Sequence, residues 1–350
     1  MAAGCAAADY DNDGWVDLYV PNPVGVASQL YHNLGNGQFE EIASQAGVAS
    51  VLQDRAALWF DYDGDQDLDL LVTRDSPSSS PFTLYGAKSD GTFEDVTAAA
   101  GLDVSLGPPK STAVMQHRSG ACAGDYDNDG WLDVCVTIWN GSPRLFRNNQ
   151  DGTFTEQTQS SGVNIPEFYW QPGFADLTGD GWLDLYLAVD FGFNQLWVNQ
   201  KDGSFVEVAA VAGADNRMND MCVTFGDHDN DGDFDIYITN IDRLHEVYGQ
   251  QHNVLLRNDS VGASLSFTDV STPLNVDAGY WGVGRDLCRC KPRRLGRRLR
   301  HERLVERPLD DGPVARLAEF RRGAFSIHER FNRCRFRRRV LGRFARLVRL

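Results

Sequence analysis

The stretch Asp9-Tyr-Asp11-Asn-Asp13-Gly14-Trp-Val-Asp17 decides the fold, because it is the first of five acidic loops with the same internal spacing. The other four loops span residues 61–69, 125–133, 176–184 and 227–235. A short alternating apolar run, such as Leu18-Tyr-Val20, follows each loop directly. Alternation with a period of two is typical of a half-buried β-strand. The pattern therefore predicts a repeated unit in which a strand follows an acidic loop.

The oxygen spacing of these loops predicts a calcium site in each. Ca²⁺ takes six to eight hard oxygen ligands, and an Asp-x-Asp-x-Asp-Gly loop wraps alternate carboxylates around one point. In the first copy Gly14 allows the sharp turn, and Asp17 at the ninth position closes the cage. Without a cation the carboxylates would repel one another. Asp, Asn and Gly are also ordinary turn residues, but five copies with one spacing favour calcium.

The distance between loops predicts the architecture. The loops begin at residues 9, 61, 125, 176 and 227, at intervals of 52, 64, 51 and 51 residues. A second hairpin signature, Leu30 to Phe39, returns at 145–154 and 196–205, and an Ala-Gly-Val element follows it at 46–48. Asn-Gly or Asp-Gly between apolar runs is a strong hairpin signal. Each unit thus contains four strands, as one propeller blade does, whereas β-helix repeats are much shorter.

This combination of motifs resembles the FG-GAP/VCBS repeat proteins, whose repeats build the calcium-binding β-propeller also seen in the integrin α-subunit head. Within that group the chain is most similar to bacterial relatives of the cartilage acidic protein family, which often carry an ASPIC/UnbV domain after the propeller. The resemblance covers residues 1–284, and Phe225-Gly226-Asp227 comes nearest to the Phe-Gly signature. It implies an all-β propeller of four-stranded blades with Ca²⁺ as the bound ion, incomplete because five repeats are recognisable.

The candidate metal ligands are the alternate positions of the five loops. Two loops depart from the pattern, since Gln66 replaces the turn glycine and Thr178 replaces an aspartate, and we expect both sites to bind more weakly. The candidates are Asp9, Asp11, Asp13, Asp17, Asp61, Asp63, Asp65, Asp69, Asp125, Asp127, Asp129, Asp133, Asp176, Thr178, Asp180, Asp184, Asp227, Asp229, Asp231 and Asp235.

The charge of the 350-residue chain is unevenly distributed. Its net charge is −16. Residues 1–284 hold 42 Asp and Glu against 11 Lys and Arg, a balance of −31, while residues 285–350 hold 7 against 22, a balance of +15. A strongly acidic surface repels nucleic acid and anionic membranes, and it favours cations or basic partners. We therefore predict a protein or glycan ligand and no nucleic acid.

The N-terminal residues carry no recognisable secretory signal, and no run is long enough for a transmembrane helix. The opening residues match the strand that precedes later loops, as at 120–124, so the chain begins inside a repeat. Two explanations are a first blade completed by the C-terminus and a truncated gene product, and we favour truncation. The full-length form is expected to be extracellular, periplasmic or at the cell surface.

Seven cysteines do not form a recognisable disulfide framework. Cys5, Cys122 and Cys222 each lie just before an acidic loop, which predicts that they pack as small apolar residues between blades. Cys122 and Cys135 could also pair across one hairpin. No Cys/His spacing indicates zinc.

The repeat pattern stops after Gly284, and an Arg-rich tail occupies residues 285–350. At face value such a tail suits nucleic acid, heparin or anionic lipid. A reading-frame shift explains more. Back-translation of residues 285–303, read one nucleotide later, permits Ala-Asp-Val-Asn-Arg-Asp-Gly-Trp-Asp-Asp, the missing sixth loop. Residues 316–325 permit a hairpin signature in the same frame. We predict a frameshifted, poorly ordered tail outside the propeller.

Two classes of function fit the sequence. The first is an extracellular or cell-surface binding or adhesion module in which calcium is structural. The second is a propeller enzyme, a lyase or hydrolase, with its site on inserted loops. The candidates are His117 and Arg118 in insert 103–118, and His245, Glu246 and His252 in insert 241–252. No nucleophile motif or phosphate loop accompanies them, so solvated loops are favoured. Dockerin-like modules use similar loops, but they pair two copies with helices.

Overall fold

The computed structural model describes residues 5–23, 25–74, 82–104, 107–240, 244–245, 249–250, 252–262 and 264–277. The predicted boundary between residues 284 and 285, the Arg-rich tail and the frameshift lie outside these residues and remain predictions. Among the described helices, none is long and apolar enough to cross a membrane.

The described residues form five four-stranded antiparallel units, called sheets below, one for each predicted repeat. The last three are joined into one twelve-stranded sheet by pairing of Trp139 with Phe168 and of Asp190 with Asn219. In sequence order the first two sheets contain β1 (Ala6–Ala8), β2 (Asp17–Val20), β3 (Gln29–Asn33) and β4 (Phe39–Glu41), then β5 (Asp54–Phe60), β6 (Asp69–Arg74), β7 (Phe82–Ala87) and β8 (Phe93–Asp95). The third and fourth contain β9 (His117–Gly124), β10 (Asp133–Gly141), β11 (Arg144–Asn148) and β12 (Phe154–Glu156), then β13 (Glu167–Ala175), β14 (Asp184–Phe193), β15 (Gln195–Asn199) and β16 (Phe205–Glu207).

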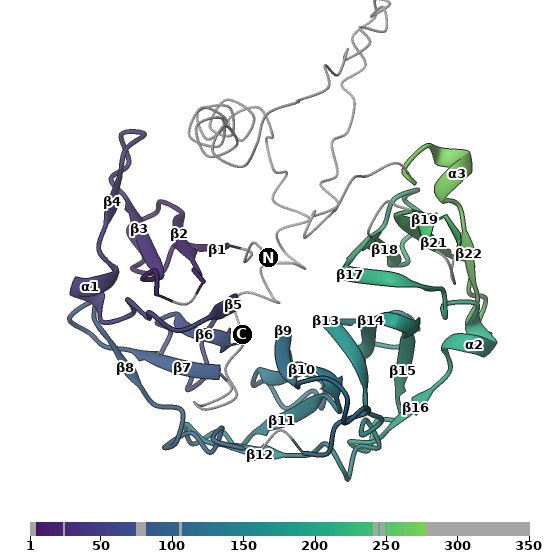
Figure 1. The fold of residues 1–350 in the computed structure, drawn as a ribbon, viewed down its shortest axis with the longest axis horizontal. Helices are drawn as coiled ribbons and strands as arrows, with labels where there is room; N and C mark the ends of the chain where they lie inside the picture. The colour runs from purple at the N-terminus through teal and green to yellow at the C-terminus, as the bar shows by residue number, and fades with distance from the viewer. Residues whose placement is uncertain are drawn as a thin grey trace, which may run out of the picture. The chain divides into compact units, whose positions relative to one another are not determined.

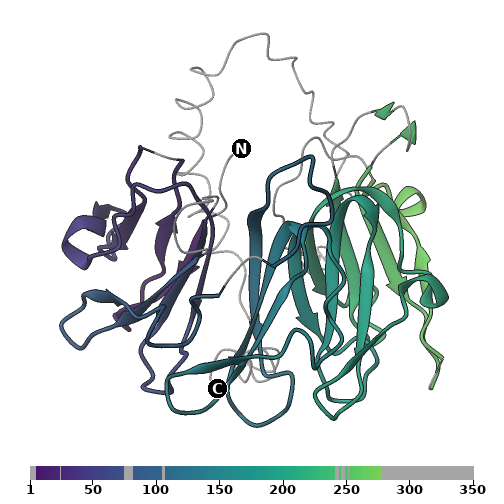
Figure 2. The same cartoon turned by 60° about the horizontal axis from the view of Figure 1, so that its bottom comes forward.

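The fifth sheet contains β17 (Arg217–Gly226), β18 (Asp235–Asn240), β21 (Val254–Asn258) and β22 (Phe267–Asp269), and the pair β19 (Leu244–His245) and β20 (Gly249–Gln250) lies in its insert. Figure 1 shows the first strand of each sheet innermost and the last strand outermost, and Figure 2 shows the sheets side by side. This is the predicted propeller-like arrangement of four-stranded blades. In the described part of the chain, no ladder joins the fifth sheet to the first, so the set of sheets is not closed.

The hydrophobic core lies between successive sheets. The residue directly after the ninth loop position faces the preceding sheet, and the next residue faces the following one, because side chains alternate along a strand. In β10, Val134 packs with Phe60 and Leu71 of the second sheet. Its neighbour Cys135 packs with Leu185 of the fourth. Each pair of sheets therefore buries its own apolar cluster, as expected of a repeat protein.

The Ala-Gly-Val element packs against the following sheet and forms part of the seam between the two. The sequence did not predict this role. The element forms one helical turn in α1 (Ala43–Ala46) and α2 (Ala209–Ala212), each ended by a left-handed glycine. Gly101 occupies the same place in the second repeat, with φ +74°. A Cβ at Gly101 would lie 2.9 Å from the carbonyl oxygen of Phe154 in the third sheet. Glycine is required here because the next sheet approaches the backbone closely.

The fifth sheet ends in a different turn, α3 (Ser271–Leu274), and Asn275 takes the left-handed place with φ 60°. The first sheet differs in another respect. The phenylalanine that opens the last strand is 5–7% exposed in the second to fifth sheets, but Phe39 is 46% exposed. In the other sheets a preceding blade covers this ring, as Tyr126 covers Phe205 at a centroid distance of 5.6 Å.

Two predictions about cysteine need correction or refinement. Cys5 is exposed and not packed between blades, because it precedes β1 at the edge of the first sheet. Cys122 and Cys135 lie opposite each other in the register of β9 and β10, as the hairpin predicted, but both are free thiols. Burial raises the pKa of the Cys122 thiol, so the pair packs as small neutral side chains.

Candidate metal centres in the acidic loops

Each acidic loop connects the first and second strands of its sheet. The aspartate at its ninth position is buried and held by backbone hydrogen bonds. These five carboxylates, at positions 17, 69, 133, 184 and 235, are at most 2% exposed. In the third loop, Asp133 accepts a backbone N–H from Tyr126 at 3.1 Å and another from Asn148 at 2.8 Å. Burial nevertheless raises its pKa to about 8, with part of the rise coming from Asp127. A buried carboxylate in this state is stabilised by a nearby cation.

The first aspartate of each loop shapes the turn. In the first loop Asp9 accepts the N–H of Gly14 at 3.0 Å, and in the fourth Asp176 accepts that of Gly181 at 2.9 Å. Gln66, which replaces the glycine in the second loop, donates to Asp61 at 3.0 Å in the same way. It does so with φ 76°, a strained value for a residue with a side chain. The loop thus keeps its shape despite the substitution.

In each of the first three loops, the structure brings together three of the four predicted ligands. In the first, second and third loops, ligand atoms of three aspartates lie within 4.8 Å of one another. These groups are Asp9, Asp11 and Asp13; Asp61, Asp63 and Asp69; and Asp125, Asp127 and Asp133. In the fifth loop Asp229 and Asp235 gather with His228. The spacing suits a single divalent cation held by oxygen atoms.

Two orphaned polar atoms support the fit to a metal ion. Asp9 Oδ1 in the first loop and Thr178 Oγ1 in the fourth are buried and have no hydrogen-bond partner. An unpaired buried polar atom is unfavourable, and a calcium ion at the loop centre would give each one a partner. Thr178 therefore keeps an oxygen at the position where the other loops have a carboxylate, although it supplies no charge.

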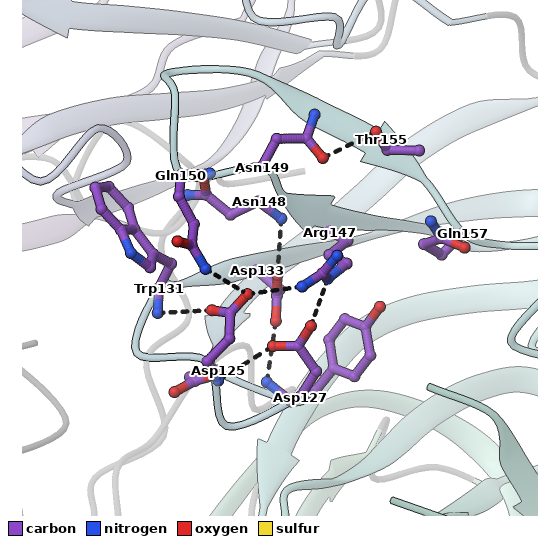
Figure 3. Close-up of polar contacts among 12 residues, drawn as sticks. Asp125, Asp127, Trp131, Asp133, Arg147, Asn148, Asn149, Gln150, Thr155 and Gln157 are labelled. Carbon is purple, nitrogen blue, oxygen red and sulfur yellow. Dashed lines mark hydrogen bonds and ion pairs between the residues drawn. The ribbon is translucent and has the colours of Figure 1, made fainter. Parts of the chain in front are cut away.

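In the first and third sheets, the next-to-last residue of the third strand places a basic side chain over the acidic loop of its own sheet. In the first sheet this residue is His32, whose Nδ1 lies 3.2 Å from Asp11 and 3.4 Å from Asp17. In the third sheet it is Arg147, which forms an ion pair with Asp127 and another with Asp129 at 2.9 Å (Figure 3). Neither contact was predicted from the sequence, because the register of the third strand against the loop is a tertiary feature.

The residues predicted for an alternative enzyme site lie in the two inserts, and the structure describes only some of them. His117 lies in β9 and stacks on Trp139 with a centroid distance of 4.6 Å. The insert before it folds onto the end of β10, where Asn140 Nδ2 donates to the carbonyl of Ser111 at 2.8 Å. The structure describes His252 and, in β19, the backbone of His245. Glu246 lies outside the described residues, as do the side chains of Arg118 and His245. These contacts give the first insert a packing role.

A pocket of 310 Å³ lies at the seam between the third and fourth sheets, beside the acidic loops. It is lined by Tyr126, Asp127, Arg147, Gln157, Ser160, Trp182, Lys201, Asp202 and Gly203. Two cationic and two anionic side chains balance one another, and Trp182 adds an aromatic face. Neither insert contributes to this lining.

The chain belongs to the FG-GAP-like repeat family, which matches at residues 9–72, 61–136, 125–187 and 176–238. Each match begins at the first aspartate of one loop and ends in the sheet that follows it. The sequence-based recognition of the family is therefore confirmed.

Curated relatives include cartilage acidic protein 1 from Homo sapiens, which is 24% identical over 281 residues and covers 72% of this chain and 41% of the relative. The Xenopus tropicalis protein is 24% identical over 257 residues, with coverages of 69% and 39%. The chain thus spans about two fifths of the length of these relatives.

Two solved structures are similar at a lower level. One is an Agrocybe aegerita lectin that recognises non-reducing terminal N-acetylglucosamine, with 18% identity, a TM-score of 0.44 and coverages of 76% of this chain and 65% of the lectin. The other is the V. cholerae biofilm matrix protein Bap1, with 12% identity, a TM-score of 0.43 and coverages of 76% and 38%. Likenesses of this size carry no functional assignment.

Proposed function

We propose that this chain is a calcium-stabilised propeller module that binds a protein or glycan ligand outside the cytoplasm or at the cell surface. The observation that carries the calcium part is the second loop. Ligand atoms of Asp61, Asp63 and Asp69 lie within 4.8 Å of one another, and burial raises the pKa of Asp69 to about 8. Three carboxylates held this closely favour a divalent cation.

The role of the ion is structural in this proposal. Every loop joins two neighbouring strands of one sheet, so a bound ion would hold that strand pair in register. Binding to the folded state alone stabilises it by about 2.7 kcal/mol per site when free calcium is 100 times Kd. Extracellular calcium modules bind at roughly 10⁻⁴–10⁻³ M, which suits the family's usual location outside the cytoplasm.

The binding part of the proposal rests on the loops and on the seam pocket. A concave site with one aromatic face and several convergent polar groups suits a small polar ligand such as a glycan residue. Trp182 provides the aromatic face, and Gln157 and Ser160 provide neutral hydrogen-bonding groups. The acidic balance of residues 1–284 supports a neutral or basic partner rather than nucleic acid.

The calcium part is tested by thermal unfolding of the full chain in EDTA and in millimolar CaCl₂. We expect calcium to raise the melting temperature, and Asp63→Asn to reduce the shift because it removes one ligand charge. Asp151→Asn is the matched control, since Asp151 lies in a hairpin and accepts from Thr153 outside the acidic loops. An unchanged melting temperature for the parent chain would refute calcium binding.

The ligand part is tested separately on arrays of neutral and acidic glycans, with calcium-loaded protein and with EDTA-treated protein. We expect retention that requires calcium and that falls at least tenfold in Trp182→Ala. Retention that is equal in EDTA contradicts the calcium requirement. Retention that Trp182→Ala leaves unchanged contradicts the assignment of the pocket as the ligand site.

A further inference from the structure

We infer that the third acidic loop is not a calcium site, because Arg147 supplies the cation within the chain. The inference rests on the proposed calcium binding of the other loops. The third loop, Asp125-Tyr-Asp127-Asn-Asp129-Gly-Trp-Leu-Asp133, keeps every predicted ligand and the turn glycine, as the first loop does, and the sequence predicted a full site there. The contacts of its carboxylates disagree with that prediction.

The guanidinium of Arg147 contacts both central carboxylates of the loop. Its Nε is paired with Asp127 Oδ2 and its Nη2 with Asp129 Oδ2 at 2.9 Å. Gln150 Nε2 donates to the same Asp129 oxygen at 3.0 Å. Figure 3 shows Arg147 pointing from β11 toward Asp127. The oxygen atoms that would bind calcium are thus already bound to nitrogen donors.

The first and last ligand positions of this loop accept backbone donors, as they do in the first, second and fourth loops. Asp125 accepts the N–H groups of Asp129 and Gly130 at 3.0 and 2.9 Å. Asp133 accepts from Tyr126 and Asn148 as described above. Among the buried side-chain atoms without a partner, the described residues of the first and fourth loops contribute one oxygen each, and those of the second, third and fifth contribute none. What distinguishes the third loop is therefore the pairing of its two central carboxylates with an arginine, Arg147.

The other four sheets show why Arg147 is decisive. The equivalent residues are His32, Gly86, Val198 and Arg257. Gly86 has no side chain and Val198 has no charge, so the second and fourth loops receive no cation from this position. In the fourth loop Lys201 Nζ contacts one central carboxylate, Asp180, at 3.1 Å, whereas Arg147 bridges two. Arg257 is the informative comparison, because its Nε is paired with Asp259 at 2.7 Å, outside the fifth loop. An arginine at this position thus neutralises a loop only when it turns toward the carboxylates.

The ion pairs of Arg147 exclude calcium from the third loop. A guanidinium that is bound to two carboxylates occupies one oxygen of each with a directed, charge-assisted hydrogen bond and offsets their negative charge. Calcium would have to displace it from both Asp127 and Asp129. The loop consequently keeps its shape without metal, while its neighbours depend on the ion. The third acidic loop therefore has the same conformation at any calcium concentration.

The test is calcium stoichiometry by equilibrium dialysis of the full chain, for the parent protein, Arg147→Val and Arg257→Val. Valine is the residue that the fourth sheet carries at this position, so it suits the strand. We expect Arg147→Val to bind one more calcium ion than the parent and Arg257→Val to bind the same number. Equal stoichiometry for the parent and a folded Arg147→Val would overturn the inference.

A second pair of variants keeps the test independent of how well Arg147→Val folds. Asp63→Asn and Asp127→Asn change the same position in the second and third loops. We expect Asp63→Asn to lose one ion, or to bind it at least tenfold more weakly, and Asp127→Asn to leave calcium binding unchanged. Loss of an ion in Asp127→Asn refutes the role of Arg147. If the parent chain binds no calcium, the proposed function is refuted. In that case the inference about the third loop survives only if Arg147→Val binds an ion.

Discussion

Asn199 in the fourth sheet donates its side-chain amide to the backbone carbonyl of Tyr126 in the third sheet, at 2.8 Å and across 73 residues of sequence. The same amide donates to the carbonyl of Leu183 in its own sheet at 3.0 Å. Asn148 repeats the contact with Tyr62, and Asn258 repeats it with Leu177. In the third, fourth and fifth sheets, one asparagine at the end of the third strand therefore fastens the acidic loop to the loop of the preceding sheet.

Replacing Asn199 by alanine should weaken the seam between the third and fourth sheets. The carbonyls of Tyr126 and Leu183 would lose their side-chain donor, at a cost of roughly 1–3 kcal/mol for each buried group left unpaired. Urea unfolding measures the loss. Asn33→Ala is the matched control, because Asn33 Nδ2 makes one exposed contact, with the carbonyl of Val16. A loss as large in Asn33→Ala as in Asn199→Ala would contradict the inter-sheet role.

The seam between the first and second sheets lacks this asparagine, since Ala87 stands in its place. The backbone N–H of Ala87 still donates to Asp69 at 2.8 Å, so the strand is in the same register as its counterparts. Ala87→Asn should add a donor for the carbonyl of Tyr10 and raise the free energy of unfolding by about 1 kcal/mol. Ala87→Asp has a similar size but no amide, and should destabilise the protein through repulsion with Asp69. Equal effects of the two variants would argue against the contact.

The left-handed glycine of the seam gives a steric test. Gly101→Ala would place a Cβ 2.9 Å from the carbonyl oxygen of Phe154, whereas Gly91→Ala, at a similar φ, meets nothing within 4 Å. Both substitutions add left-handed strain of roughly 1–2 kcal/mol. Gly101→Ala should lose roughly 1–3 kcal/mol more because of the overlap. Denaturant unfolding of the two variants compares them directly, and equal losses would show that the close approach is unimportant.

A buried carboxyl away from the loops gives a pH prediction. Burial raises the pKa of Asp220 to about 7, although hydrogen bonds from Asn194, Asn240 and Asn216 oppose the rise. Between pH 4, near the pKa of an unfolded aspartate, and pH 7, the Asp220 carboxyl is therefore protonated in the folded state and ionised in the unfolded state. Stability should fall as pH rises through this window, by up to about 1.4 kcal/mol per pH unit, and the contribution should be constant above it.

Asp220→Asn should remove this slope, because an amide does not titrate. The measurement is the free energy of unfolding at pH 5 and pH 8 in EDTA, for the parent chain and the variant. The difference between the two proteins isolates Asp220 from the loop carboxylates, which titrate in both. An identical pH dependence in Asp220→Asn would mean that Asp220 is ionised throughout.

The sequence predicted the parts of this molecule that repeat locally. Five aspartate loops, the apolar runs after them and the Asp-Gly hairpins were enough for the fold class, the strand order within a sheet and the carboxylates that meet. These features depend on residues within one blade, where spacing along the chain fixes neighbours in space.

The features that the sequence missed join residues from different strands or sheets. Asn148 and Asn199 stood in the hairpin signature, but their role depends on which carbonyl the preceding sheet brings near. Arg147 was overlooked because only the pairing of β11 with β10 places it over the loop. Repetition offered one usable signal, since an asparagine returns at the same place in four of the five repeats.

The most direct test of the account is anomalous diffraction from crystals of the full chain grown in CaCl₂. The account predicts anomalous peaks between the carboxylates of the second loop, between Asp9, Asp11 and Asp13 in the first, and beside Thr178 in the fourth, with no peak beside Arg147. A map without peaks in the first, second and fourth loops, at calcium concentrations above 10 mM, would contradict the claim that these loops are calcium sites.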